Sequence, residues 1–152
     1  MQVPYEVRFI SDQKGHGVFA LEDIGQGRVI YRLQSDQRAT VVGDDLLQGY
    51  VERFYETEED LARFLTYSFC ASDKTCVDAT ASDCRFINHS AVRPNSALVH
   101  GSGDSVSIRG IRAGEEIVED YGEYPSSPGY DILLGKHPSL VSALWDYTQS
   151  PD

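Results

Sequence analysis

The chain has little cysteine, and the cysteines it has follow no recognised pattern. Among 152 residues, Cys70, Cys76 and Cys84 are spaced C-x5-C-x7-C. A disulfide framework needs an even number of cysteines, and a zinc knuckle needs closely spaced CxxC pairs. The sequence therefore predicts three buried, reduced thiols and no metal site.

Long apolar runs are also missing. No stretch approaches the roughly 20 apolar residues of a membrane span. The opening Met-Gln-Val-Pro-Tyr-Glu has neither the basic start nor the apolar core of a signal peptide. We therefore expect a soluble, intracellular protein, nuclear or cytoplasmic, with no membrane partner.

Basic residues are scarce relative to acidic ones. The 13 Lys and Arg residues stand against 24 Asp and Glu residues, which gives a net charge of -11. This charge repels nucleic acid phosphates, so we expect no direct nucleic acid binding, and it attracts basic proteins or peptides. An excess of acid also serves simply to keep a protein soluble, so charge alone leaves both interpretations open.

Most of the chain has the pattern of short strands. With 41% apolar residues and no internal repeat, the sequence fits one compact domain, mainly β with minor α. Alternating apolar and polar residues, separated by glycine turns, predict the strands. The expected strands cover residues 5–10, 18–21, 29–31, 76–79, 97–99, 106–108 and 116–118.

A helical insert near residues 44–68 interrupts the strands. Leu46, Tyr50 and Phe54 recur at every fourth position, which is typical of an amphipathic helix. Thr57 precedes three acidic residues, as an N-cap does, and predicts the start of a second helix. The stretch from residue 124 onward is rich in proline and aromatic residues, and serves either as packing or as a lid.

The densest group of polar residues is Arg85-Phe86-Ile87-Asn88-His89-Ser90, which closes with Pro94-Asn95. If this segment is buried, Asn88 and His89 need hydrogen-bond partners, because an unsatisfied buried polar group costs about 1–3 kcal/mol. A structural hydrogen-bond knot explains the pattern as well as a ligand site does.

The same segment resembles the central signature of the SET-domain methyltransferases. Further matches follow in the family's order over about residues 7 to 122, and none would be specific alone. Gly15-His16-Gly17 resembles the family's N-terminal glycine turn, and Tyr67-Ser68-Phe69 resembles its tyrosine-containing strand. The run from Gly114 to Gly122, which includes Asp120-Tyr121-Gly122, resembles its closing motif.

The resemblance implies a fold and a division of the chain. The fold has several small β-sheets around a C-terminal pseudoknot, formed here by residues 85–95 and 115–122. It departs from the usual rule against threaded chains. Residues 1–123 would form the SET domain, and residues 124–152 would be an extension that completes the cofactor or substrate site.

The resemblance also implies S-adenosylmethionine as cofactor and lysine methylation as the reaction. The catalytic residues would be Tyr121 and Tyr67. The residues expected to bind the cofactor are Lys14, Gly15, His16, Gly17, Tyr67, Arg85, Phe86, Asn88, His89, Tyr121 and Tyr124. The methyl group would pass to the side-chain amine of a lysine in a basic protein or peptide, with a histone tail among the candidates.

Two rival interpretations stay open. A catalytically silent SET fold would bind a peptide or protein without methylating it. An active enzyme without reader modules would equally suit a ribosomal, cytosolic or other protein substrate. We also expect that so small a domain can form a homodimer to complete its substrate groove.

The sequence departs from the family's pattern at two places. Glu119 stands where many histone-directed members have phenylalanine or tyrosine, and we expect it to face solvent rather than the lysine channel. No cysteine follows Gly122, so the family's Cys-rich zinc cluster is missing. An aromatic side chain of Tyr124, Tyr130 or Trp145 would then cover the adenine, although for each residue taken alone packing in the core or in a lid is the favoured role.

Overall fold

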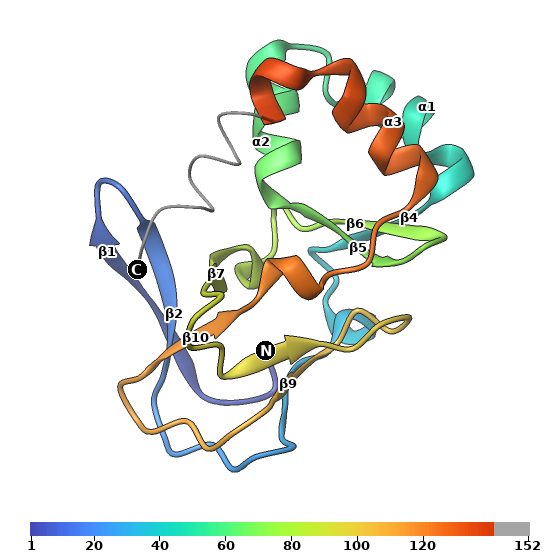
Figure 1. The fold of residues 1–152 in the computed structure, drawn as a ribbon. Coiled ribbons are helices and arrows are strands. Elements are labelled where there is room, and N and C mark those ends of the chain that lie inside the picture. The colour runs from blue at the N-terminus through green and yellow to red at the C-terminus, as the bar shows by residue number, and fades with distance from the viewer. Residues whose placement is uncertain (142–152) are drawn as a thin grey trace.

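The computed structural model describes residues 1–141 of the chain. Its strands and helices alternate in short pieces (Figure 1). The strands are β1 (Tyr5–Ser11), β2 (Gly15–Ala20), β3 (Val29–Tyr31), β4 (Thr40–Gly43), β5 (Ser68–Ser72), β6 (Thr75–Asp78), β7 (Asn88–His89), β8 (Ser96–Leu98), β9 (Ser105–Ser107) and β10 (Glu116–Glu119). The α-helices are α1 (Leu47–Phe54), α2 (Glu58–Tyr67) and α3 (Pro128–Lys136).

The larger sheet has the strand order β1-β2-β10-β8-β9-β3, and β7 also pairs with β10. Strands β1 and β2 form an antiparallel hairpin, and β10 continues the sheet through the pair Glu116 and Phe19. The inward side chains of these strands and their connections form a closed apolar core. It includes Val3, Val18, Ala20, Ile24, Ile30, Ile87, Ile111 and Ile117.

The chain from β7 to β8 wraps around β10. Both β7 and β8 lie parallel to β10, and both pair with its Glu119 end. The Ser90 amide donates to the Glu119 carbonyl at 2.9 Å, and the Asn95 amide donates to the Val118 carbonyl at 3.1 Å. The buried Asn95 side chain also donates to the Glu116 carbonyl at 2.7 Å and accepts from the Val118 amide at 2.9 Å. This arrangement is the predicted pseudoknot, in which the loop between β7 and β8 holds β10, a strand that follows it in the chain.

The helices gather at one end of the molecule, beyond the small sheet β4-β6-β5 (Figure 1). Thr57 caps α2 as predicted, because its hydroxyl accepts from the Asp60 amide at 3.1 Å. The apolar faces of the helices share a core that includes Val42, Leu47, Val51, Leu61, Phe64, Leu65 and Leu133. None of the helices within residues 1–141 is long and apolar enough to cross a bilayer.

A buried carboxylate fastens α1 to the small sheet. Asp78 on β6 is 5% exposed and accepts hydrogen bonds from the hydroxyls of Tyr50, at 2.7 Å, and Tyr55. Its other oxygen accepts from the Thr80 amide and hydroxyl. Although burial raises the pKa of Asp78, these donors outweigh burial and hold that pKa below its ordinary value.

The segment after residue 123 packs onto the helical insert over its described part. Ser127 caps α3, and the Gly129 amide donates to the Asp44 carboxylate at 2.9 Å. The three cysteines are free thiols, as expected, although Cys84 is only half-buried. Within residues 1–141, no three His, Cys, Asp or Glu side chains gather closely enough to hold a metal ion.

Candidate functional site

Tyr121 follows β10 directly and lies against the loop that wraps that strand. Its hydroxyl donates a hydrogen bond to the Ile87 carbonyl, and its amide donates to His89 Nδ1 at 3.0 Å. The rings of Tyr121 and His89 are 5.2 Å apart. The pseudoknot therefore fixes both ends of the half-buried tyrosine.

The hydrogen bond from Tyr121 assigns the tautomer of His89. Because Nδ1 accepts a backbone N–H, the ring proton is assigned to Nε2. His89 Nδ1 also lies 3.8 Å from Asp120 Oδ1, a distance at which a protonated ring would form an ion pair. The same nitrogen cannot accept from Tyr121 and donate to Asp120, so the 3.0 Å hydrogen bond prevails. His89 therefore offers an Nε2–H donor.

Asn88 joins the signature segment to the glycine turn. Its side-chain amide donates to the His16 carbonyl at 2.9 Å and to Glu116 Oε1 at 2.8 Å. A Cβ at Gly17 would lie 2.6 Å from Glu116 Oε1 and 2.7 Å from Ile10 Cδ1, so a larger residue there would have to displace both side chains. The two glycines of the turn thus differ, because Gly15 has a φ of 71° and no heavy atom within 4 Å of a Cβ position.

Four predicted cofactor residues form a continuous row of stacked side chains. The exposed His16 ring lies 5.5 Å from the Phe86 ring. The Arg85 guanidinium lies over Phe86 at 4.5 Å and over Tyr67 at 5.8 Å, and it donates to the Thr80 carbonyl. Tyr67, the last residue of α2, therefore meets Arg85, whereas the ring contacts of Tyr121 are with His89 and Tyr124. Lys14, another predicted residue, lies in the β1–β2 turn, where its amide donates to Ser11 Oγ.

Glu119 is buried, and the prediction that it faces solvent is wrong. Its side chain is 1% exposed and accepts hydrogen bonds from the hydroxyls of Ser105 and Tyr124. Burial raises the pKa of its carboxyl, although the hydrogen bonds oppose that shift. The strand period explains the correction: along β10, Ile117 and Glu119 are buried while their neighbours are half-exposed.

Tyr124 forms one wall beside Tyr121. Its ring is 5.2 Å from Tyr121 and 5.7 Å from Phe69, and burial raises the pKa of its phenol well above the ordinary value. Tyr130 packs in the helical core, with its hydroxyl 3.0 Å from Ser68 Oγ. Trp145 lies outside the described residues.

The sequence reasoning did not assign roles to several residues that shape this site. Glu116 holds the Asn88 amide, Asn95 ties the loop to β10, and Ser105 donates to Glu119. Asn95 and Glu116 both stood inside quoted motifs, so their polar side chains beside buried strands were an available signal. Ser105 belongs to a strand distant in the chain, and nothing local pointed to it.

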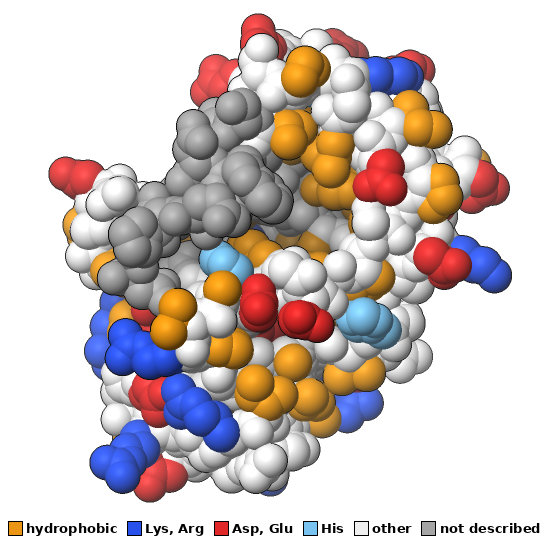
Figure 2. Space-filling model, in the orientation of Figure 1, with side chains coloured by type: hydrophobic (Ala, Val, Ile, Leu, Met, Phe, Trp, Pro, Cys, Tyr) orange, Lys and Arg blue, Asp and Glu red, His pale blue; other side chains and the backbone are white. Residues whose placement is uncertain are grey.

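On the visible face of the molecule, acidic and histidine side chains lie close together between the helical end and the larger sheet (Figure 2). Lysine and arginine side chains on this face gather mainly over the larger sheet, away from that central group (Figure 2). The central region of this face therefore carries acidic and histidine side chains among hydrophobic ones (Figure 2).

Comparison with known proteins agrees with this geometry. A family model described as the SET domain matches residues 15–122. No curated protein sequence matches the chain. Among solved structures it resembles that of DIM-5, a Neurospora SET domain protein described as a histone lysine methyltransferase, with a TM-score of 0.58 and 22% identity. That match covers 79% of this chain and 52% of the DIM-5 chain, so the chain spans about half of that structure's length.

The family match extends from the glycine turn at Gly15 to the Asp-Tyr-Gly motif at Gly122. Those two ends meet in space, because Asn88 bonds to the glycine turn and Tyr121 bonds to the chain around Asn88. The fold resembles that of a lysine methyltransferase. Because the family model matches most of the chain and the structure agrees with it, we conclude that the chain belongs to the SET-domain family.

Proposed function

We propose that this protein transfers a methyl group from S-adenosylmethionine to the side-chain amine of a lysine in a basic protein. The observation that carries the proposal is the setting of Tyr121. Its hydroxyl proton is committed to the Ile87 carbonyl, so the lone pairs of the phenol oxygen are directed at whatever lies beside it. An amine that approaches Tyr121 would thus meet an acceptor, which orients the amine for attack.

The residues around Tyr121 suit the proposed cofactor. The open space beside Gly15 would admit the methionine part of S-adenosylmethionine against the backbone of Lys14 to Gly17. Asn88 and the Nε2–H of His89 would hold its amino-acid and adenine ends through hydrogen bonds. When bound, the cofactor supplies a methyl carbon on a positively charged sulfur, which a neutral amine can attack.

The target lysine must lose its proton before it reacts. Free lysine has a pKa of about 10.4, so few molecules are neutral at pH 7. The rings of Tyr121, Tyr124 and Phe69 pack together and would give the lysine an apolar wall, which disfavours the charged ammonium. The buried Glu119 carboxyl already accepts from Ser105 and Tyr124, so the proposal gives it no role as a base.

The charge of the protein supports a basic substrate. A net charge of -11 favours encounter with lysine-rich proteins, and DIM-5, which shares the fold, is described as acting on histones. We therefore propose histones as the first substrates to test, with other basic proteins as the next.

The test is incubation of the purified protein with methyl-labelled S-adenosylmethionine, core histones and whole-cell protein extract. Label on a histone lysine would support the enzyme and its substrate together. Label on an extract protein alone would support methyl transfer and indicate that the substrate is a protein other than a histone. Absence of label together with absence of cofactor binding in calorimetry would refute the proposal and favour the binding-module interpretation.

A further inference from the structure

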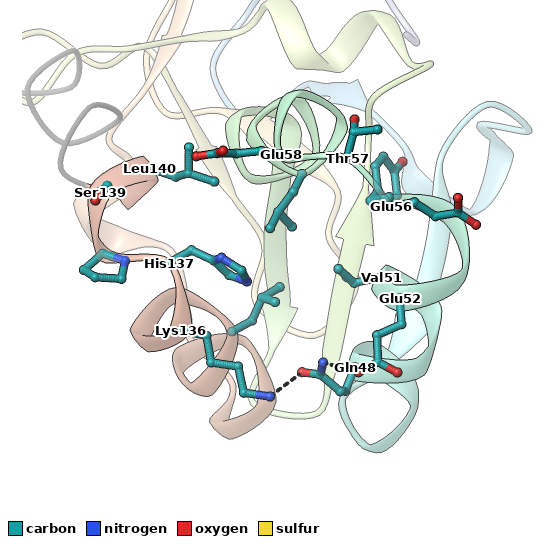
Figure 3. Close-up of a pocket in the computed structure, with 14 residues that line it drawn as sticks. Gln48, Val51, Glu52, Glu56, Thr57, Glu58, Lys136, His137, Ser139 and Leu140 are labelled. Atoms are coloured by element: carbon teal, nitrogen blue, oxygen red, sulfur yellow. Dashed lines mark hydrogen bonds between the residues drawn. The ribbon is translucent and has the colours of Figure 1, made fainter.

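A groove of about 840 Å³ lies between α1, α3 and the start of α2 (Figure 3). Its lining includes none of the predicted site residues, so it is separate from the region around Tyr121. Its floor is formed by side chains of the helical core, Val51, Leu61 and Leu133, which are 4%, 7% and 1% exposed. The half-buried Tyr55 and Leu140 also line the groove and supply apolar surface that a partner can reach.

The rim of the groove is acidic. Glu52, Glu56 and Glu58 line it from α1, from the loop between α1 and α2, and from the first turn of α2. Within residues 1–141, no ion pair joins a lysine or arginine to any of these three carboxylates. Their negative charge is therefore left to attract a cation from outside the chain.

In the described part of the chain, the lysine on the opposite rim forms no ion pair with these carboxylates. Lys136 at the end of α3 reaches across to Gln48, with its ammonium 3.0 Å from Gln48 Oε1 (Figure 3). Gln48 in turn donates to Glu52 at 2.7 Å. The chain of hydrogen bonds closes one end of the groove and leaves Glu56 and Glu58 beyond it (Figure 3).

We propose that this groove docks a second, basic and amphipathic segment of the same protein substrate whose lysine reaches Tyr121. The identity of this partner rests on the proposed function, whereas its composition is inferred from the groove. Its apolar residues would contact the floor, and its lysine or arginine residues would pair with Glu56 and Glu58. An amphipathic helix in a groove is an established mode of peptide recognition.

The length of α2 separates the groove from the signature segment. The helix runs from Glu58 at the groove to Tyr67, which contacts Arg85, and this is roughly 14 Å at about 1.5 Å per residue. An extended chain covers that distance with no fewer than about four residues. A short peptide centred on the target lysine would therefore miss the groove, whereas an intact protein would use both sites and gain from the higher effective concentration.

The first experiment measures binding without any methyl transfer. The probe is a fluorescent amphipathic helix of about 14 residues built from leucine and lysine, with a scrambled peptide of the same composition as control. Fluorescence anisotropy would compare the unaltered protein with Glu56→Lys and with Glu22→Lys. Glu22 is the matched control, because it is also an exposed loop residue and lies outside the groove lining.

We expect Glu56→Lys to weaken binding of the amphipathic probe about three- to tenfold at low salt, because one attraction becomes a repulsion. The difference should vanish at ~0.5 M salt. Glu22→Lys should bind as the unaltered protein does. An equal loss in both variants, or equal binding of the scrambled peptide, would overturn the proposal, because net charge alone would then explain the affinity.

Two further readouts separate the alternatives. If Glu56→Lys alters sedimentation of the protein and not probe binding, the groove holds a second copy of the chain and the proposal is wrong. In the methylation assay, Glu56→Lys should raise KM for the intact protein substrate and leave that of a short peptide unchanged. Because the binding assay needs no cofactor, its failure is distinguishable from failure of the proposed methyl transfer.

Discussion

At the scale of single residues, Glu119 is the most informative departure from the family's pattern. It stands two residues before Tyr121, is almost fully buried, and shares its carboxyl between Ser105 and Tyr124. Because Tyr124 packs on Tyr121 at 5.2 Å, the carboxyl fixes one wall of the candidate site. The strand period explains why Glu119 points inward, because it follows the buried Ile117 by two residues, but the adjacent apolar Ile117 and Val118 left the buried face undecided in the sequence.

The burial of Glu119 predicts how stability depends on pH. A carboxyl whose folded-state pKa is raised favours folding below its unfolded pKa, and that contribution is lost as pH rises through the folded pKa. Glu119→Gln mimics the protonated group at every pH. We therefore expect its Tm, relative to the unaltered protein, to rise as pH increases above the unfolded pKa of about 4.3 and to level off above the raised folded pKa, measured by calorimetry.

A Tm difference that is constant or falls with pH would contradict this account of Glu119. Glu115→Gln serves as the opposite control, because hydrogen bonds to Arg109, Arg112 and Asn95 outweigh burial and hold the pKa of Glu115 below its ordinary value. Its carboxylate contributes stability above the unfolded pKa, and that contribution is lost as pH falls through the lower folded pKa. The Glu115→Gln variant should therefore lose stability relative to the unaltered protein as pH rises from 3 to 6.

Substitution by alanine should lower the free energy of unfolding by different amounts at the two glycines of the β1–β2 turn. Gly17→Ala would place a Cβ 2.6 Å from Glu116 Oε1 and 2.7 Å from Ile10 Cδ1, and we expect a loss of about 1–3 kcal/mol in unfolding free energy. Gly15→Ala meets no neighbouring atom and strains only the φ of 71°, at about 1 kcal/mol. Urea unfolding would measure both.

The same pair of variants separates packing from cofactor contact. If the space beside Gly15 is where the cofactor lies, Gly15→Ala should weaken binding of S-adenosylmethionine by more than its small effect on stability suggests. Calorimetric titration that gave equal affinities for Gly15→Ala and the unaltered protein would exclude contact of the cofactor with Gly15.

At the scale of elements, α2 connects the groove to the candidate site, and its start is fixed by Thr57. The Thr57 hydroxyl accepts from the Asp60 amide at 3.1 Å, so Thr57→Ala should cost about 1 kcal/mol. For a chain of this length that lowers Tm by roughly 2–4 °C. Thr66→Ala is the matched control within the same helix, and it should be neutral or stabilising, because alanine has the higher helix propensity. Equal losses in both variants would show that Thr57 does not act as a cap.

Elements with a strong local signal were predictable from the sequence, and elements held by distant partners were not. The period of Leu46, Tyr50 and Phe54 and the cap at Thr57 are local features, and both helices form where expected. Strand β4 was missed, because it is short, Val41 within it is exposed, and pairing with β6 completes it. Helix α3 was not predicted, because its sequence mixes proline with aromatic residues and has no clear helical period. A hydrogen bond from its Gly129 amide to Asp44, which is distant in the chain, helps to hold it in place.

The site was predictable in its members and less so in its arrangement. The motifs pointed to Asn88, His89 and Tyr121, which the pseudoknot brings together. Tyr67 was predicted as a catalytic residue together with Tyr121, and the structure places it at the end of α2, where its ring contacts Arg85. Hydrogen bonds between residues as distant as Asn88 and His16 leave no periodic trace in the sequence.

At the scale of the whole molecule, the pseudoknot makes the candidate site and the fold interdependent. Asn95 and the signature loop hold β10 in place, and β10 places Tyr121. Variants of Asn88 or Asn95 therefore combine loss of fold with loss of function and test the mechanism poorly. Tyr121 is the better choice, because loss of its hydroxyl removes a polar atom and leaves the ring that packs on His89 and Tyr124.

The most direct measurement is the rate of methyl transfer by Tyr121→Phe under single-turnover conditions, with Tyr130→Phe as control for loss of a phenol hydroxyl in the helical core. We predict that Tyr121→Phe lowers the rate about a hundredfold or more while its affinity for S-adenosylmethionine and its Tm stay close to those of the unaltered protein. Tyr130→Phe should keep the rate. Unchanged transfer by Tyr121→Phe would contradict the account, because the phenol oxygen beside Ile87 would then have no part in the reaction.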